Sequence, residues 1–465
     1  MLSAMVTRTI RDDSSATFRA HREALGRRLP EGLILLASAP EVLRNGDVHF
    51  HYRQGSDFLY LTGVQEPGYA LLLDPARGAE ALFVPKLTQQ HAVWMGHIPS
   101  REEAREAFGI REVLYREDLA KVLKKWARGK ALVHADARAS GLARRTVGAS
   151  RVRTAELKEA LQDLRILKTP GELVLLRRAS AATATGHITA MRVTRPGLHE
   201  YEVQAELERE FQRAGCPQLG YRSIVAGGRN SAVLHYHDNR ARLARGELLL
   251  IDAGAECRGY TADVTRTFPV SGRFTRRQRD VYEVVLEAQN RGIDFARAGR
   301  TSMELQVLAE RVLAEGLRSL GFLKGSTDEL LETEAIRVFF PHGIGHTLGL
   351  DVHDVQGGKK RRLRKQRAGQ LRFRARLEPG FVITVEPGVY FIAALLHDPE
   401  KRRKHRGRID FALAERFLDF GGVRIEDDVV VRREGPPENL TPVPKSVADV
   451  EAACAEGREA EARSA

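Results

Sequence analysis

The sequence predicts an α/β (or α+β) protein of two domains. Its 465 residues are too many for one ordinary hydrophobic core. Helical and strand-like patterns alternate up to about residue 165, and acidic side chains recur within apolar strand-like runs beyond it. We expect a first domain at residues 1–165, a second at 166–445, and a charged tail at 446–465 that forms a helix or a frayed end.

Short apolar runs and helical patterns alternate in the first domain. The run Leu-Ile-Leu-Leu-Ala, at 33–37, is typical of a buried strand. The expected strands lie at 33–37, 69–73 and 81–84, and the expected helices at 17–29, 101–108 and 118–126. No group of candidate ligands converges there, so we expect the chemistry in the second domain.

The second domain begins with a clear helix signal. Thr169 can cap and Pro170 can start a helix that runs to about Met191. Further helices are expected at 199–214 and 278–297. Between these helices, the apolar run at 248–251 and the Thr- and Val-rich run at 260–268 indicate two strands.

Acidic residues inside these strand-like runs are the most informative feature of the chain. Asp252 ends the first run and Asp263 lies in the second, so an antiparallel pair joined at 254–259 could face both carboxylates to one side. A carboxylate in an apolar strand is costly unless its charge is compensated. With one imidazole, the candidate metal ligands are Asp252, Asp263, His346, Glu386 and Glu426.

This ligand set predicts a centre of two divalent metal ions. Alone, a histidine in a glycine-rich loop or an aspartate at a strand end is more often structural, so the prediction depends on the whole set. Oxygen ligands with a single imidazole suit Mn²⁺, Mg²⁺, Fe²⁺ or Co²⁺ better than a thiolate zinc site does. Two such ions, about 3.5–4 Å apart, could activate a bridging water for hydrolysis.

Three histidines are candidates for work beside the metals. His342 precedes His346 by four residues, His353 follows it by seven, and His235 lies in a separate segment. Amide hydrolysis needs donors for the developing oxyanion and a proton for the leaving nitrogen. Histidines close to the metals could supply both.

At these motifs the chain resembles the pita-bread metallopeptidases that cleave before proline, namely the Xaa-Pro aminopeptidases (aminopeptidase P) and the Xaa-Pro dipeptidases (prolidases). The resemblance covers nearly the whole chain. The segments that carry it lie at 52–63, 234–236, 250–254, 263–269, 341–346, 352–355, 385–388 and 423–426. It implies a creatinase-like N-terminal α/β domain followed by a pita-bread catalytic domain.

The resemblance also implies roles for the candidate residues. Asp252 and Glu386 would help to hold one metal with His346, Asp263 would chelate the other, and Glu426 would share the pair. Mn²⁺ is the expected ion, with Co²⁺, Fe²⁺, Zn²⁺ or Mg²⁺ as alternatives. The implied roles are general base for Glu386 and contact with substrate for His235 and His353. His342 would either support a metal ligand or handle protons, and Arg424 would orient a carboxylate or contact substrate.

The sequence favours a dipeptidase over an aminopeptidase. The segment at 52–63 looks like aminopeptidase P, but the segments at 82–87, 91–96, 420–426 and 440–446 look like prolidases. Arg372 occupies the place of the prolidase arginine that binds the free carboxylate of proline, although it could also be one of several solvated arginines. We expect proline-containing dipeptides as substrates, with an aminopeptidase acting on longer peptides as the alternative.

The net charge of +13 raises the possibility of a nucleic-acid or other polyanionic partner. Basic residues are dense at 359–367 and 401–408, but without interleaved aromatic residues for base stacking. We therefore expect solvated basic loops and no nucleic-acid partner, with a non-catalytic polyanion-binding protein as a distant alternative. A creatine-type amidinohydrolase on the same fold is disfavoured, since that chemistry does not need the metals.

Composition and the terminal segment suggest a cytoplasmic protein. No apolar run approaches the roughly 20 residues of a membrane span. Residues 1–13 lack the apolar core of a signal peptide. With three cysteines we expect reduced thiols and no disulfide framework. The family likeness implies a homodimer.

Overall fold

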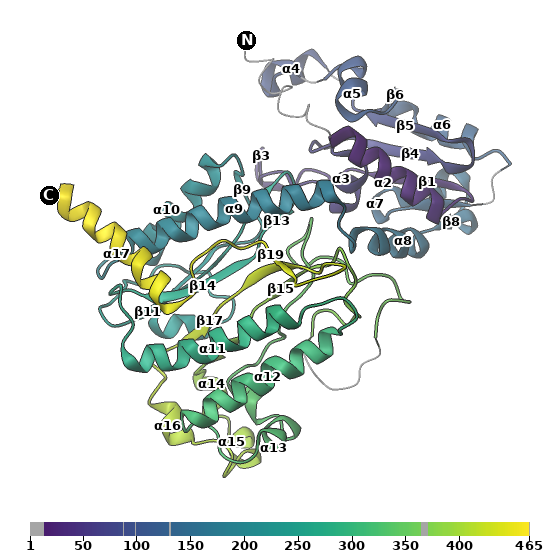
Figure 1. Ribbon diagram of the computed structural model, residues 1–465. Helices are drawn as coiled ribbons and strands as arrows, with labels where there is room; N and C mark the ends of the chain where they lie inside the picture. Colours follow the sequence, from purple (N-terminus) through teal and green to yellow (C-terminus); the bar gives the residue numbers. More distant parts are fainter. Residues whose placement is uncertain (1–13, 87, 98, 130–131, 364–370, 465) are drawn as a thin grey trace. The chain divides into compact units, whose positions relative to one another are not determined.

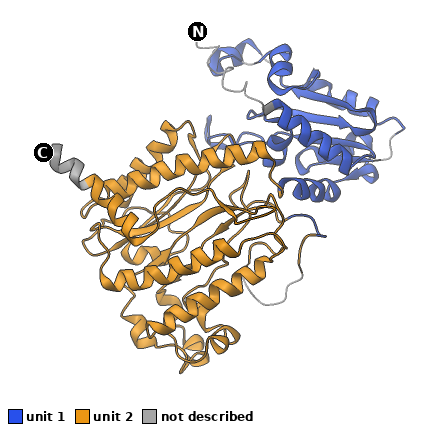
Figure 2. Cartoon of the chain, in the orientation of Figure 1, with its two compact units in different colours: residues 1–165, 357–360 blue, residues 166–356, 361–465 orange. Residues whose placement is uncertain are grey.

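The chain folds into two compact units, coloured separately in Figure 2. The computed structural model describes residues 14–86, 88–97, 99–129, 132–363 and 371–464. The first unit spans 1–165 with the short segment 357–360, and the second spans 166–356 with 361–465. Residues 1–13 and 364–367, which bear on the expectations for a signal peptide and for the first basic stretch, lie outside the described residues.

The first unit is a six-stranded mixed sheet with helices, as the α/β prediction requires. Its strand order is β6-β5-β4-β1-β7-β8, and the central strand β1 is buried at all five positions. The strands of this sheet are β1 (Leu33–Ala37), β4 (Ala70–Asp74), β5 (Ala79–Val84), β6 (Glu112–Tyr115), β7 (Val133–Ala135) and β8 (Val152–Arg153), and a separate hairpin pairs β2 (Leu43–Asn45) with β3 (Val48–His49).

The helices of the first unit are α2 (Ser14–Arg28), α3 (Ser56–Thr62), α4 (Gln89–Met95), α5 (Arg101–Phe108), α6 (Leu119–Trp126), α7 (Ala137–Val147) and α8 (Ala155–Arg165). The predicted strand at 33–37 and the predicted helix at 101–108 have the predicted bounds. The latter helix starts where a capping box forms, since Ser100 accepts a hydrogen bond from the backbone of Glu103 and the Glu103 side chain accepts one in return.

The second unit encloses short antiparallel sheets between two groups of helices (Figure 1), which is the pita-bread arrangement. On one side α9 packs against α10, α17 and the strands β12 to β14, and on the other α11 packs against α12 and the strands β15 to β17. The helices are α9 (Pro170–Val193), α10 (Glu200–Arg213), α11 (Arg276–Phe295), α12 (Ser302–Ser319), α13 (Thr327–Glu332), α14 (Ala393–Leu396), α15 (Pro399–Lys404), α16 (Phe411–Glu415) and α17 (Val447–Ser464).

The strands of the second unit are β9 (Gln218–Leu219), β10 (Ile224–Gly227), β11 (Leu248–Ala253), β12 (Ala255–Cys257), β13 (Tyr260–Thr261), β14 (Val264–Pro269), β15 (Val382–Val385), β16 (Gly388–Tyr390), β17 (Gly422–Arg424), β18 (Asp427–Val430) and β19 (Glu438–Asn439). The predicted bounds of α9, α10 and α11 agree with the structure to within about two residues at each end. For α9, Thr169 caps the helix and Pro170 is its first residue, as expected.

Two sequence-based expectations are wrong, one about the cysteines and one about the basic run at 401–408. Cys216 and Cys257 form a disulfide, whereas we expected reduced thiols; Cys454 is buried and is not part of this disulfide. The two cysteines are 41 residues apart, and only the antiparallel pairing of β9 with β12 brings their Cα atoms to 4.7 Å. Local sequence carries no signal for that pairing.

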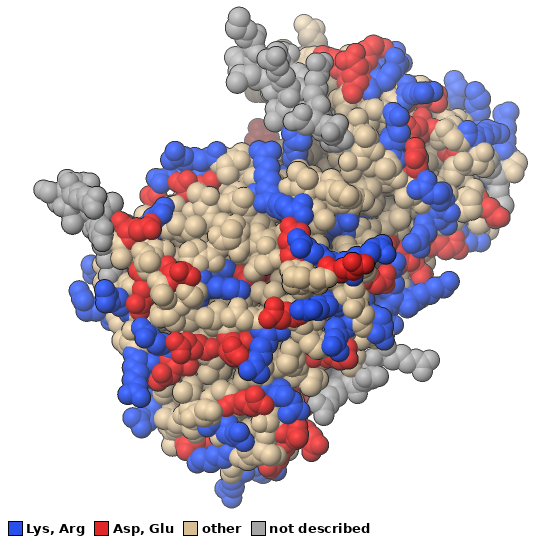
Figure 3. Space-filling view, viewed as in Figure 1, with Lys and Arg blue, Asp and Glu red and all other residues tan. Residues whose placement is uncertain are grey.

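The basic run at 401–408 is not simply a loop. Its first half forms α15, because Asp398 caps the helix and Pro399 begins it. Several of its cations are paired with acids, including Arg402 with Glu415 and Arg408 with Glu329. On the face drawn in Figure 3, basic and acidic side chains are likewise interspersed. Among the described residues, every helix is too short or too polar to span a lipid bilayer.

A fully buried ion pair joins two strands of the second unit, β14 and β18. The guanidinium of Arg266, on β14, donates to Asp427 at 2.6 Å, and neither side chain is accessible to solvent. The same guanidinium donates to the backbone carbonyls of Glu426 and Val443. Although burial opposes ionisation, Arg266 and Lys445 hold the pKa of Asp427 at about 2. The pair therefore stays charged and fixes β14 against β18.

We predict that Arg266→Met destabilises the protein by about 3–5 kcal/mol, because the substitution leaves Asp427 buried beside fewer compensating charges. The free energy of unfolding, measured by denaturant titration, checks this. The control is Arg291→Met, which removes an exposed pair with Glu287 and should cost less than about 1 kcal/mol. Equal effects of the two substitutions would contradict the prediction.

Candidate active site

The pairing of β11 with β14 brings Asp252 and Asp263 together. Asp252 lies opposite Thr265 in the antiparallel register, and Asp263 comes immediately before β14. The Tyr221 hydroxyl lies 2.6 Å from Oδ1 of Asp252 and 2.5 Å from Oδ1 of Asp263. The two carboxylates therefore face the same side.

His346 and Glu386 lie on adjacent strand-like segments. The segment before His346 pairs with β15: the Glu386 amide donates to the carbonyl of Ile344, and the Thr384 amide donates to that of His346, each at 2.9 Å. A Cβ on Gly345 would lie 2.1 Å from the Thr384 carbonyl oxygen, so this close approach requires glycine. The pairing leaves Nε2 of His346 3.7 Å from Oε1 of Glu386.

Glu426 reaches the same place from between β17 and β18. Its amide donates to the carbonyl of Thr265 at 3.1 Å, and the Thr265 hydroxyl donates to its carboxylate at 2.7 Å. Because Thr265 is two residues beyond Asp263, this contact sets the Glu426 carboxylate beside that of Asp263.

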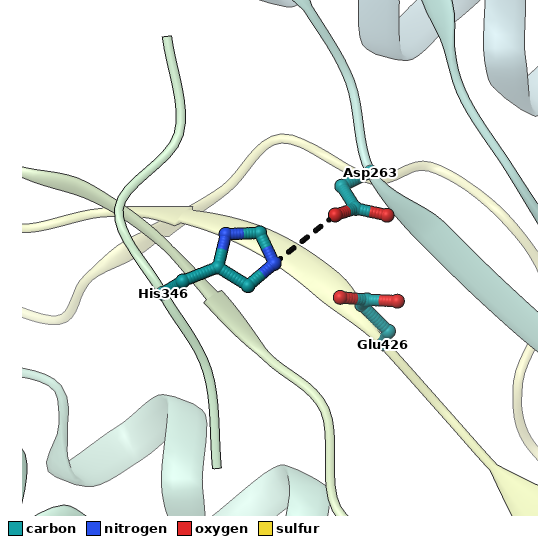
Figure 4. Close-up of side chains that lie close together, drawn as sticks. All are labelled: Asp263, His346 and Glu426. Carbon is teal, nitrogen blue, oxygen red and sulfur yellow. Dashed lines mark ion pairs between the residues drawn. The ribbon is translucent and has the colours of Figure 1, made fainter. Parts of the chain in front are cut away.

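Asp263, His346 and Glu426 form the tightest group of candidate ligands (Figure 4). Their ligand atoms lie within 4.8 Å of one another, and Nε2 of His346 is 3.2 Å from Oδ2 of Asp263. Asp252 and Glu386 line the same cavity, which has a volume of about 880 Å³. The structure thus brings all five predicted ligands to one cavity.

The donor set fits hard divalent cations. Nδ1 of His346 lies 3.2 Å from the carbonyl oxygen of Thr347, to which it donates, so Nε2 is the ring nitrogen left to bind a cation among the carboxylates. Burial raises the pKa of Glu426 well above its usual range and that of Glu386 to about 7. Cations held by these oxygens and this nitrogen would balance the crowded negative charge.

The three candidate histidines all line this cavity, at different depths. His342 is mostly buried, and this burial lowers its pKa to about 3 and keeps it neutral. Its Nδ1 faces the carbonyl oxygen of Gly343 at 2.9 Å and must donate there, so Nε2 accepts from the Tyr390 hydroxyl at 2.9 Å. His235 and His353 line the cavity and are exposed.

Arg372 touches His353. Its Nη1 lies 3.3 Å from Nδ1 of the imidazole. A guanidinium only donates, so Nδ1 is the acceptor and Nε2 of His353 carries the proton. Arg372 also lines the cavity, where its own charge faces incoming ligands. Its prediction as a carboxylate-binding residue stays a prediction.

Arg424 holds Asp252 in place. Its guanidinium donates to the Asp252 carboxylate at 2.5 Å, to the Tyr390 hydroxyl at 2.9 Å and to the Thr265 hydroxyl at 3.0 Å. The expected contact with a nearby acid is therefore present. Direct contact of Arg424 with substrate stays a prediction.

Two tyrosines at the site were missed by the sequence analysis. Tyr221 bridges two candidate ligands, and Tyr390 joins His342 to Arg424. Tyr390 follows the Glu-Pro-Gly motif by two residues on β16, so its place in a strand beside a candidate ligand was a usable signal. For Tyr221 we find no comparable local signal.

Comparison with protein families and curated sequences gives matches over both units. The model of metallopeptidase family M24 matches residues 174–433, and that of the aminopeptidase P N-terminal domain matches residues 18–134. The chain is 37% identical to an Escherichia coli Xaa-Pro aminopeptidase, covering 92% of this chain and 95% of that one. It is 34% identical to the human Xaa-Pro dipeptidase, covering 95% and 93%.

Solved structures resemble the whole chain as well. A Pseudomonas aeruginosa aminopeptidase PepP superimposes with a TM-score of 0.82 at 36% identity, covering 96% of this chain and 99% of that chain. A zinc-substituted E. coli aminopeptidase P in complex with product gives a TM-score of 0.82 at 35% identity, with the same coverage.

We predict that Tyr221→Phe weakens Mn²⁺ binding by about 10–100-fold, because it removes the hydroxyl that orients Asp252 and Asp263. Isothermal titration of Mn²⁺ into the metal-free protein measures the change. Tyr201→Phe, at an exposed position on α10, is the matched control and should bind Mn²⁺ as the unsubstituted protein does. Unchanged affinity in Tyr221→Phe would refute the orienting role.

Proposed function

Because the chain belongs to metallopeptidase family M24, we propose that it is an Xaa-Pro aminopeptidase that removes the N-terminal residue from peptides with proline in second place. The observation that carries the proposal is the group formed by Asp263, His346 and Glu426 at the wall of a large cavity. The similarity of both units to aminopeptidase P supports it. This choice reverses the order of the sequence-based preference, which put dipeptides first.

We further propose that two divalent ions occupy the site, with Mn²⁺ as the first candidate and Co²⁺, Fe²⁺, Zn²⁺ or Mg²⁺ as alternatives. The residues that would hold them are Asp252, Asp263, His346, Glu386 and Glu426. When bound, such ions would lower the pKa of an attacking water and polarise the scissile carbonyl. One relative, an E. coli aminopeptidase P, has been solved in a zinc-substituted form, which agrees with a site that accepts several ions.

Side chains of the protein would carry out proton transfer and stabilise the charge that develops during hydrolysis. Glu386 would accept the proton of the attacking water. His353, with its proton on Nε2, and His235, which lines the same cavity, would donate hydrogen bonds to the carbonyl oxygen as negative charge develops there. His342, neutral and joined to Tyr390, would shape the wall beside Glu386, whose Oε2 lies 3.6 Å from its Nδ1.

A dipeptidase is the second candidate, and one residue favours it. Arg372 lines the cavity beside His353, where it could bind the free carboxylate of a C-terminal proline. The human Xaa-Pro dipeptidase is nearly as similar to this chain as the bacterial aminopeptidase is. A longer peptide has an amide in place of that carboxylate and would lose the ion pair.

We also propose a homodimer. The first unit has exposed apolar side chains on two elements: Val93, Trp94 and Met95 on α4 are 75%, 78% and 65% exposed, and Leu43 and Val48 on the β2–β3 hairpin are 59% and 51% exposed. Apolar surface of this kind often marks a protein interface. Light scattering of the purified chain would decide the oligomeric state.

We predict hydrolysis of both an Xaa-Pro dipeptide and a pentapeptide with proline in second place, with the higher kcat/KM on the pentapeptide. Treatment with a chelator should abolish turnover of both, and added Mn²⁺ should restore it, because the ligands hold the ions that activate water. A peptide with alanine in second place is the control substrate. Higher kcat/KM on the dipeptide would overturn the aminopeptidase assignment in favour of the second candidate.

We predict that Arg372→Ala lowers kcat/KM on the two peptides by similar factors, because its contact with His353 serves either substrate. The measurement is the ratio of the two losses. Arg376→Ala, at an exposed arginine whose guanidinium donates to the Gly299 carbonyl, is the control and should leave both values unchanged. A loss at least tenfold greater on the dipeptide would instead identify Arg372 as its carboxylate receptor.

A further inference from the structure

We propose that a buried ion pair between Lys168 and Asp354 positions His353 for catalysis. The inference rests on the proposed function, since it concerns a residue that acts there. Asp354 directly follows His353 in the chain, and Lys168 comes just before α9, far from it in sequence. Neither residue touches the reacting atoms, so both are positioning residues.

The ion pair is short and closed to solvent. Nζ of Lys168 donates to Oδ2 of Asp354 at 2.8 Å, and each side chain is only 1% exposed. Lys168 is itself fixed, because its backbone amide donates to the carbonyl of Gly380 at 2.8 Å, and the Gly380 amide donates to that of Val431. The cation is thereby anchored to the framework of β15 and β18, the strands that flank Glu386 and Glu426.

The loop that carries His353 closes on itself around this pair. The Asp354 amide donates to the carbonyl of Thr347 at 2.9 Å, and the Thr347 hydroxyl donates to the carbonyl of Val355 at 2.9 Å. The segment after His346 therefore returns to its own starting point. This return places the His353 ring 4.4 Å from the His346 ring, edge to face.

Gly349 shows how tightly the loop wraps the ion pair. A Cβ at this position would lie 2.3 Å from Oδ2 of Asp354 and 2.8 Å from Cε of Lys168. Any side chain there would displace the ion pair. The backbone of Gly349 is held in turn, because its carbonyl accepts a hydrogen bond from the Thr261 amide at 3.0 Å.

Energetics favour a positioning role over a stabilising one. A buried ion pair gives little net stability compared with apolar side chains of similar size, since desolvation offsets the attraction. It does, however, favour one arrangement of its two partners over others. The imidazole of His353 is exposed and contacts Arg372 and the His346 ring, so its place depends also on its backbone, which Asp354 helps to fix. A displacement of about 1 Å of such a donor can cost about 100-fold in rate.

The test removes both charges while keeping side-chain bulk, in Lys168→Met/Asp354→Leu. With saturating Mn²⁺ and an Xaa-Pro peptide, we expect kcat to fall about 10–100-fold, with KM and Mn²⁺ affinity changed less than about threefold. The same two substitutions in a His353→Ala background should lower kcat no further. The control, Arg311→Met/Asp328→Leu, removes an exposed pair and should leave kcat unchanged.

A second measurement does not depend on activity. Hydrogen exchange of the amides at 347–355 should quicken at least tenfold in the double variant, whereas exchange along α9 should not change. Unchanged exchange in the loop, an unchanged kcat, or an equal fall of kcat with and without His353 would each overturn the proposal. If the unsubstituted protein cleaves no Xaa-Pro peptide, the proposed function fails, and loop exchange alone decides the positioning role.

Discussion

The candidate site depends on one buried contact, the ion pair between Arg266 and Asp427. Each partner lies next to a residue of the site: Thr265 precedes Arg266, and Glu426 precedes Asp427. Because the ion pair locks these two chain segments in one register, the Thr265 hydroxyl meets the Glu426 carboxylate and the amide of Glu426 meets the Thr265 carbonyl. Asp263 and Glu426 become neighbours as a consequence, although 163 residues of sequence separate them.

That closeness has an electrostatic consequence. Burial disfavours the charged form of these carboxylates, and repulsion between neighbouring acids adds to it, so the pKa values of Asp263 and Glu426 are raised. Arg424 offsets part of the charge at Asp252, and Tyr221 orients two of the acids, but neither balances the whole set. The arrangement is thus a poor structural core and a good receptor for divalent cations, which is the condition that a family M24 hydrolase must meet.

Much of this could be predicted from sequence, and the reason lies in which signals are local. Thr169 and Pro170 fix the start of α9 within a few residues, and acids that interrupt apolar runs stand out without any knowledge of the fold. The disulfide of Cys216 with Cys257 and the bridge made by Tyr221 depend on pairings between distant strands. Their local sequence is compatible with many partners, so pattern and propensity could not select the right one.

Two buried ion pairs lie next to residues of the site, and the same physical reasoning applies to both. Arg266 and Asp427 join the strands that carry two of the carboxylates, and Lys168 and Asp354 are enclosed by the loop of His353. Apolar side chains could fill either space at less desolvation cost, but they would tolerate sliding of one segment past another. An ion pair tolerates less sliding, because the attraction between its two charges weakens as they separate. Hydrolysis at a fixed ion centre needs donors held to within fractions of an ångström, so we propose that geometric constraint, rather than added stability, explains the charges in these positions.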